Sequence, residues 1–157
     1  MNLALFSLTL LFTFVSGSAL ASAEQCFVRK YTDQHLAKNP RQMVRSIKLV
    51  LNEADGFTYV SLKARHKDED AHAIFGNGGA CDKLSSGTLE CGLDEDSGHF
   101  RVQQHGSNVL IEITTGLRLF DEDASEDDES QDTWNLAPGK DNGVFKLESV
   151  EMKNCTI

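Results

Sequence analysis

Residues 108–119 read NVLIEITTGLRL. Val109, Ile111, Ile113, Thr115, Leu117 and Leu119 share one parity, whereas Glu112, Thr114 and Arg118 share the other. Side chains of a β-strand alternate between the two faces of the sheet, so this pattern predicts one long strand with a buried face and a solvated face. Gly116 lies inside the stretch and is expected to mark a bend or a bulge.

Other segments repeat the alternation over shorter lengths. They are 47–51, 60–64, 72–75, 89–93, 99–103 and 145–147, with 27–31 as a further candidate. Glycine-bearing turns separate them, and Asn77-Gly78-Gly79 is expected to end the third strand. We therefore predict an all-β fold, a small antiparallel barrel of about eight meandering strands, with a β-sandwich as the alternative. The single helical signal is Thr32, a candidate cap for a short helix that stops before Pro40.

The N-terminus has the pattern of an export signal. Residues 3–15 are almost wholly apolar and uncharged, and the small residues Ala19, Ala21 and Ala23 follow. We predict a signal peptide over 1–23 and one β-barrel domain over 24–157, hence a periplasmic or secreted protein. An uncleaved membrane anchor is the alternative, but the apolar run is shorter than the ~20 residues that a membrane-spanning helix needs, so no stable span is expected.

The four cysteines all follow the predicted signal peptide. An even number in an exported chain predicts disulfide support. Cys81 and Cys91 flank a turn, whereas Cys26 and Cys155 lie near the two ends of the predicted domain. We therefore predict the pairs Cys81–Cys91 and Cys26–Cys155. A metal site that combines Cys81 and Cys91 with a histidine such as His72 or His99 is the alternative, but it lacks the usual ligand spacing.

Composition narrows the class of function. The 157 residues are 40% hydrophobic and 25% charged, and 24 acids against 15 bases give a net charge of -9. Nucleic acid is not an expected partner, because phosphate binding needs Lys and Arg. Ser97-Gly98-His99 places a hydroxyl near an imidazole, but so short a stretch is not an assembled catalytic triad, and the sequence lacks Gly-x-Ser-x-Gly. We predict no enzymatic activity.

Most of the net negative charge lies in one segment. Residues 121–132 read DEDASEDDESQD and contain eight acids. Three interpretations remain open: a solvated loop, a docking surface for a cationic protein or peptide, and a calcium site. The calcium candidates are Asp121, Asp123, Asp127 and Asp132, but Glu126 stands where a twelve-residue calcium loop needs glycine.

We expect a non-enzymatic binding protein, an inhibitor or docking module for a cationic protein. The partner-binding candidates are the loop acids and an aromatic anchor beside them: Asp121, Glu122, Asp123, Asp127, Asp128, Glu129 and Trp134. A calcium-dependent envelope protein is one alternative; otherwise no cofactor is expected. The other alternative is a carrier of a small apolar ligand inside the barrel, although large residues such as Phe75, Phe100 and Phe145 predict a filled interior.

Overall fold

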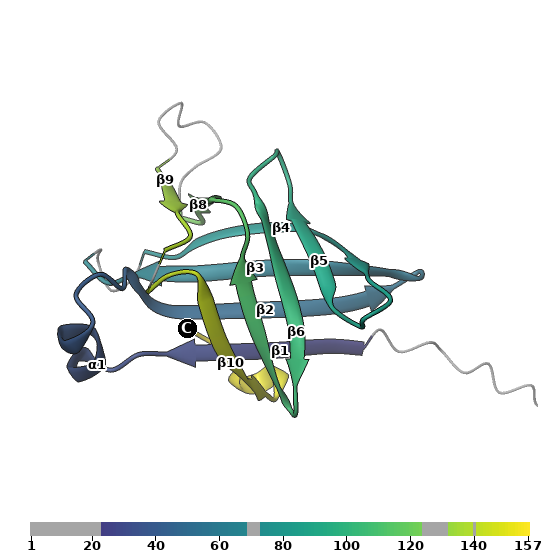
Figure 1. Ribbon diagram of the computed structural model, residues 1–157, viewed down its shortest axis with the longest axis horizontal. Helices are drawn as coiled ribbons and strands as arrows, with labels where there is room; N and C mark the ends of the chain where they lie inside the picture. Colours follow the sequence, from purple (N-terminus) through teal and green to yellow (C-terminus); the bar gives the residue numbers. More distant parts are fainter. Residues whose placement is uncertain (1–22, 69–72, 124–131, 140) are drawn as a thin grey trace, which may run out of the picture.

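A computed structural model describes residues 23–68, 73–123, 132–139 and 141–157. Within these residues the chain is nearly all β (Figure 1). The strands are β1 (Ala23–Lys30), β2 (Val44–Ala54), β3 (Phe57–His66), β4 (Phe75–Lys83), β5 (Leu89–Leu93), β6 (His99–His105), β7 (Asn108–Ile113), β8 (Leu117–Asp121), β9 (Thr133–Leu136) and β10 (Val144–Val150). Two short helices accompany them, α1 (Asp33–Lys38) and the 3₁₀ turn η1 (Met152–Asn154).

Eight of the strands form a closed antiparallel barrel. Their order is β3-β2-β1-β10-β7-β6-β5-β4, and the pairing of β3 with β4 closes the ring. Closure confirms the predicted barrel over the sandwich, because each of the eight strands has a hydrogen-bonded neighbour on both sides. β1 to β7 follow one another as a meander, and β10 fills the place between β7 and β1.

The alternation in sequence sends one parity of each strand into the barrel. Leu49, Leu62, Phe100, Ile111 and Phe145 are almost completely buried and belong to one continuous core. These large side chains fill the middle of the barrel, as the sequence predicted. A filled interior leaves room for a ligand only toward the ends.

The predicted long strand over 109–119 is wrong. It divides into β7, in the barrel wall, and β8, which leaves the wall and pairs with β4 and β9. His99 causes the division, since its carbonyl accepts hydrogen bonds from the amides of Thr114 and Thr115, at 3.1 and 3.2 Å, while the hydroxyl of Thr115 accepts the His99 amide at 2.7 Å. Gly116 thus lies in a break between two strands, and not in a bend of one.

The prediction that Asn77-Gly78-Gly79 ends a strand is also wrong. β4 begins at Phe75 and continues through these residues to Lys83. A Cβ atom on Gly79 would lie 2.1 Å from the carbonyl oxygen of Gly92, so glycine permits a close approach of β4 to β5. Gly79 thus marks close packing inside the sheet, although in the sequence an Asn-Gly-Gly stretch has the pattern of a turn.

The helix and both disulfides are as predicted. The Thr32 hydroxyl accepts the amide of His35 and begins α1. Cys26–Cys155 joins β1 to the end of the chain, and Cys81–Cys91 joins neighbouring positions of β4 and β5. The pairs favour an oxidising environment outside the cytoplasm. Residues 1–22 of the predicted signal peptide lie outside the described part, and Ala23 is the first residue of β1.

Candidate functional site

The two ends of the barrel are built differently. One end of the molecule has α1 and β9, together with the end of β3 at His66 and the start of β4 at Phe75 (Figure 1). At the other end only tight turns join the strands, and the barrel opens into a hollow. We call the first the closed end and the second the open mouth.

Trp134 helps to fill the closed end. Its ring contacts those of His66 and Phe75 edge-on, with centroids 5.0 and 5.8 Å apart. In the β8–β9 register Trp134 lies opposite Leu119, which is fully buried, so both side chains share the inner face of the hairpin. Trp134 is therefore a packing residue at the closed end and does not project from a rim.

The acids of 121–132 have different surroundings. The Asp121 amide donates to the carbonyl of Asp132 at 3.0 Å, which closes the base of the loop. The Asp121 carboxylate accepts the amide of Asp123 at 3.0 Å, and Asp123 and Asp132 are exposed. Asp127, Asp128 and Glu129 lie outside the described residues.

Glu122 has a structural partner. Its carboxylate forms an ion pair with the ammonium of Lys63 on β3, and its amide donates to the carbonyl of Ile74 at 2.9 Å. Burial lowers the pKa of the neighbouring Lys48 below its usual value; the positive charge of Lys63 lowers it further, whereas Glu122 opposes the shift. Glu122 thus offsets the positive charge of two lysines. Of the four described acids of the 121–132 segment, it is the least available to an external partner.

A second acidic segment lies beside the hairpin, and sequence reasoning missed it. The turn between β5 and β6 contains Asp94, Glu95 and Asp96, all exposed. Arg118 of β8 holds this turn: its amide donates to the carbonyl of Ser97 at 2.8 Å, and its guanidinium donates to the carbonyl of Glu95 at 3.0 Å. We call Asp94, Glu95, Asp96, Asp121, Asp123 and Asp132 the acidic surface.

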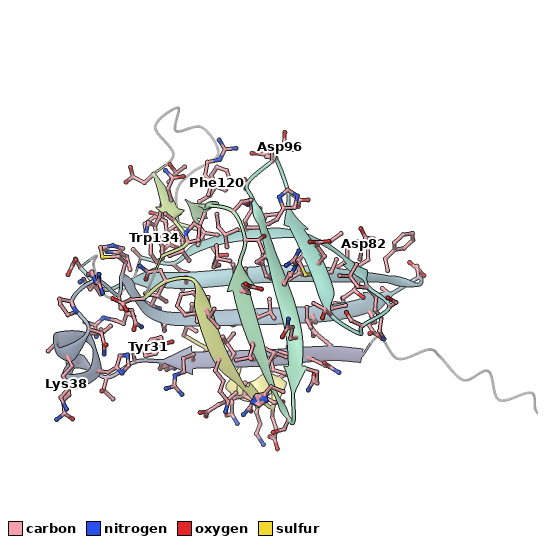
Figure 2. All side chains as sticks on the ribbon, in the orientation of Figure 1. Tyr31, Lys38, Asp82, Asp96, Phe120 and Trp134 are labelled. Atoms are coloured by element: carbon pink, nitrogen blue, oxygen red, sulfur yellow. A yellow bond between two sulfur atoms is a disulfide. The ribbon has the colours of Figure 1, made fainter. Side chains whose placement is uncertain are left out.

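Phe120 is the aromatic residue that this surface presents. It alternates with Leu119 along β8 and so lies on the outer face of the hairpin, partly exposed. The guanidinium of Arg118 lies over its ring, 5.3 Å from the centroid. Figure 2 shows Phe120 and Asp96 on the same side of the molecule, above Trp134. The sequence did not indicate that Phe120 faces outward and Trp134 inward. The face on which each side chain lies depends on the register in which β8 and β9 pair.

The candidates for catalysis and metal binding do not assemble in the described residues. Ser97 is buried at 2% exposure and its hydroxyl has no partner there, while the ring of His99 lies beside Gly92. Across 23–68, 73–123, 132–139 and 141–157, no three His, Cys, Asp or Glu side chains group as metal ligands. The calcium candidates Asp121, Asp123 and Asp132 lie within these ranges, whereas Asp127 lies outside the described residues.

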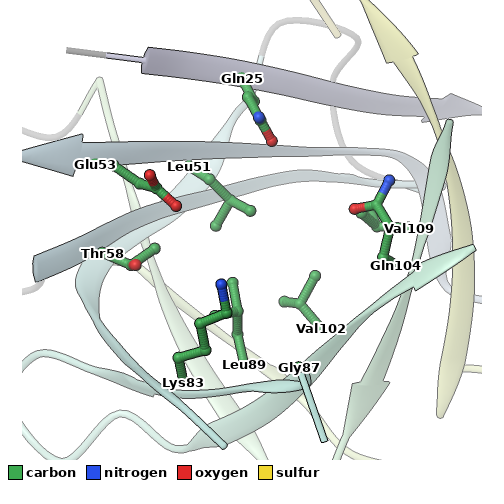
Figure 3. Close-up of a pocket in the computed structure, with 10 residues that line it drawn as sticks. All are labelled: Gln25, Leu51, Glu53, Thr58, Lys83, Gly87, Leu89, Val102, Gln104 and Val109. Carbon is green, nitrogen blue, oxygen red and sulfur yellow. The ribbon is translucent and has the colours of Figure 1, made fainter.

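The hollow at the open mouth has a volume of about 250 Å³. Figure 3 shows its lining, contributed by β1 to β7. Leu51, Val102 and Val109 are buried and form its floor, together with Leu89. The sequence identified these apolar residues as core, but it contained no signal that a hollow borders them.

Comparisons with known proteins identify no relative. No protein-family model matches the chain, and no similar protein was found among curated sequences or solved structures. No helix in the described part is both long enough and apolar enough to cross a membrane.

Proposed function

We propose that this is an exported, non-enzymatic binding protein that docks a cationic protein partner on the acidic surface. The observation that carries the proposal is the junction at Arg118, which brings the β5–β6 turn against the β8–β9 hairpin. Two acidic segments that are far apart in sequence thereby become one surface on a closed barrel.

The charge of this surface is available to a partner. No ion pair within the described residues involves Asp94, Glu95, Asp96, Asp123 or Asp132. Clustered unpaired charge raises the rate of encounter with an oppositely charged protein and makes binding sensitive to salt. In the proposal, Asp127, Asp128 and Glu129 extend the same field.

Phe120 is the proposed contact residue at the centre of the interface. Aromatic side chains with a polar border often provide much of the free energy of binding. Trp134, the anchor expected from sequence, supports the hairpin from below in this proposal. Inhibition would follow if the partner's own active site lies in the surface that the hairpin covers.

The test compares three baits made from the oxidised, purified protein. The first is the wild type, and the second carries Glu95→Gln, Asp96→Asn and Asp123→Asn. The third, a control, carries Glu24→Gln, Asp55→Asn and Asp82→Asn, which remove the same charge from exposed sites near the open mouth. Extracytoplasmic proteins of the source cells are bound to each bait and eluted with a salt gradient.

We expect one protein to be retained by the wild type and the control and to elute from the acidic-surface variant at much lower salt. Phe120→Ala should weaken its retention as well. If all three baits retain the same proteins to the same salt concentration, the acidic surface is not a docking site and the proposal fails.

A further inference from the structure

The open mouth combines an apolar floor with a polar rim. The floor is aliphatic, formed by Leu51, Leu89, Val102 and Val109. Gln25, Glu53, Thr58, Lys83 and Gln104 stand around it. A concave apolar surface with a few converging polar groups is the usual composition of a small-molecule site.

The rim groups are largely unpaired. Within the described residues the side chains of Glu53, Lys83, Gln25 and Thr58 make no hydrogen bond or ion pair, and Gln104 uses only its amide nitrogen, on the carbonyl of Gly106 at 2.7 Å. Figure 3 shows Glu53 and Lys83 reaching into the opening from two sides, with Thr58 between them. The rim thus offers one negative and one positive charge over the same apolar floor.

The strand register explains this placement. Glu53 of β2 pairs with Thr58 of β3, and Thr58 pairs with Cys81 of β4, two residues before Lys83. β2 and β4 are therefore separated by two strand spacings, roughly 10 Å. No ion pair joins the charged ends of Glu53 and Lys83, although both line the same hollow, so a small head group can lie between them.

We propose that the open mouth binds a small zwitterion with a hydrophobic tail, of the size of an aliphatic α-amino acid. The ammonium group lies beside Glu53, the carboxylate beside Lys83, and the tail on the floor. The Gln25 and Gln104 side chains supply neutral hydrogen-bonding groups at the same rim. This site is at the opposite end from the acidic surface and does not depend on the docking proposal.

The size of the hollow limits the ligand. A volume of about 250 Å³ is slightly below the range of roughly 300–1,000 Å³ for drug-sized ligands. It corresponds to about eight water molecules at the ~30 Å³ each occupies in the liquid. An amino acid with a branched tail fits this space, whereas the packed core below blocks a long acyl chain.

The test is a calorimetric and NMR titration of the oxidised protein with four ligands: L-leucine, glycine, L-leucinamide and N-acetyl-L-leucine. Glycine lacks the tail, and the last two each carry only one charge. We expect L-leucine to bind tightest and to shift the amide signals of Leu51, Thr58, Lys83 and Val102. Glycine should bind at least about tenfold more weakly, since it buries no side chain. The single-charge ligands should bind about two- to fivefold more weakly, which is typical of exposed ion pairs.

Two variants test which side chain binds which charged group of the ligand. Lys83→Gln should weaken binding of N-acetyl-L-leucine but not of L-leucinamide, and Glu53→Gln should do the reverse. Glu112→Gln and Lys146→Gln, exposed positions in the barrel wall, are the matched controls and should change nothing. The proposal is overturned if L-leucine produces neither heat nor shifts at its solubility limit, or if it binds no better than glycine. Equal affinities of L-leucine and either single-charge ligand would also overturn it.

Discussion

The closed end and the open mouth are stabilised by different means. The closed end is filled by segments from distant parts of the sequence, including the β5–β6 turn and the β8–β9 hairpin. Among the described residues no comparable segment covers the open mouth, and both disulfides lie toward it: Cys26 follows Gln25, and Cys81 pairs with Thr58, two residues that line the hollow. The comparison teaches that the two ends are held differently: distant segments pack at the closed end, whereas two disulfides with buried cysteines, Cys26 and Cys91, link the chain near the open mouth.

Removal of the disulfides should have the largest effect. Cys26–Cys155 spans 129 residues and should contribute about 5 kcal/mol to the free energy of unfolding, whereas Cys81–Cys91 spans 10 and should contribute about 3 kcal/mol. Denaturant unfolding of the two double Cys→Ala variants measures both values. Amide exchange should increase more at the open mouth than at the closed end in the Cys81/Cys91 variant. Equal acceleration at the two ends would contradict the division of roles.

Glycine substitution distinguishes the turns of the two ends. Gly98 at the closed end has φ +107°, and a Cβ there would lie 2.1 Å from the carbonyl oxygen of Gly116. Gly106 at the open mouth has φ +66° with open space around it. We expect Gly98→Ala to cost about 2–5 kcal/mol, from backbone strain and overpacking together, and Gly106→Ala only about 1–2 kcal/mol.

The measurement for this pair is the midpoint of thermal or urea unfolding. Gly106→Ala is the matched control. It carries the strain of a positive φ, as Gly98→Ala does, but without a close neighbouring atom. If the two variants lose the same stability, the closed end tolerates a shift of the β5–β6 turn away from Gly116, and its packing is looser than described.

Substitution of Trp134 and Phe120, the two aromatic residues of the β8–β9 hairpin, distinguishes a side chain that packs in the fold from one that is presented to a partner. Trp134→Ala removes contacts with His66 and Phe75 and should cost about 2–3 kcal/mol, since the ring is only partly buried. Phe120→Ala, on the outer face of the same hairpin, should cost less than about 1 kcal/mol. Chemical denaturation measures both. A larger loss for Phe120 would reverse the assigned faces of β8.

The smallest effect concerns pH. Burial raises the pKa of Tyr31, which stacks on His35 at the closed end; Arg29 and Gln42 partly oppose the shift. Because the folded state holds the phenolic proton more tightly than the unfolded state, its contribution to stability is fully present below pH 10 and is lost as the pH rises through the raised pKa. Tyr31→Phe should make stability less steeply dependent on pH above 10. An unchanged slope in urea titrations would show that Tyr31 does not contribute.

Local patterns in the sequence predicted the wall of the barrel well. Alternation identified the strands because a half-buried strand has one apolar face, and the cysteine positions identified both disulfides. The errors occurred where long-range contacts compete with local pattern. His99 divides the alternating stretch 108–119, and the close approach of β4 to β5 accounts for a glycine, Gly79, inside a strand.

The candidate sites were less predictable for the same reason. The sequence placed an acidic loop, but it could not join that loop to Asp94–Asp96 or decide between Trp134 and Phe120. Nor could it show that Leu51, Val102 and Val109 form the floor of a hollow, because an apolar pattern does not reveal which core residues border an open space.

By itself the sequence determined the all-β class, the antiparallel meander, the cysteine pairs and the concentration of negative charge in one loop. Each follows from local spacing or composition. Only the tertiary structure decided the closure of the barrel, the path of β8 out of its wall, the joining of two acidic segments at Arg118 and the opening at the other end. These features depend on which distant segments pair, and pairing is set by the packing free energy of the whole chain.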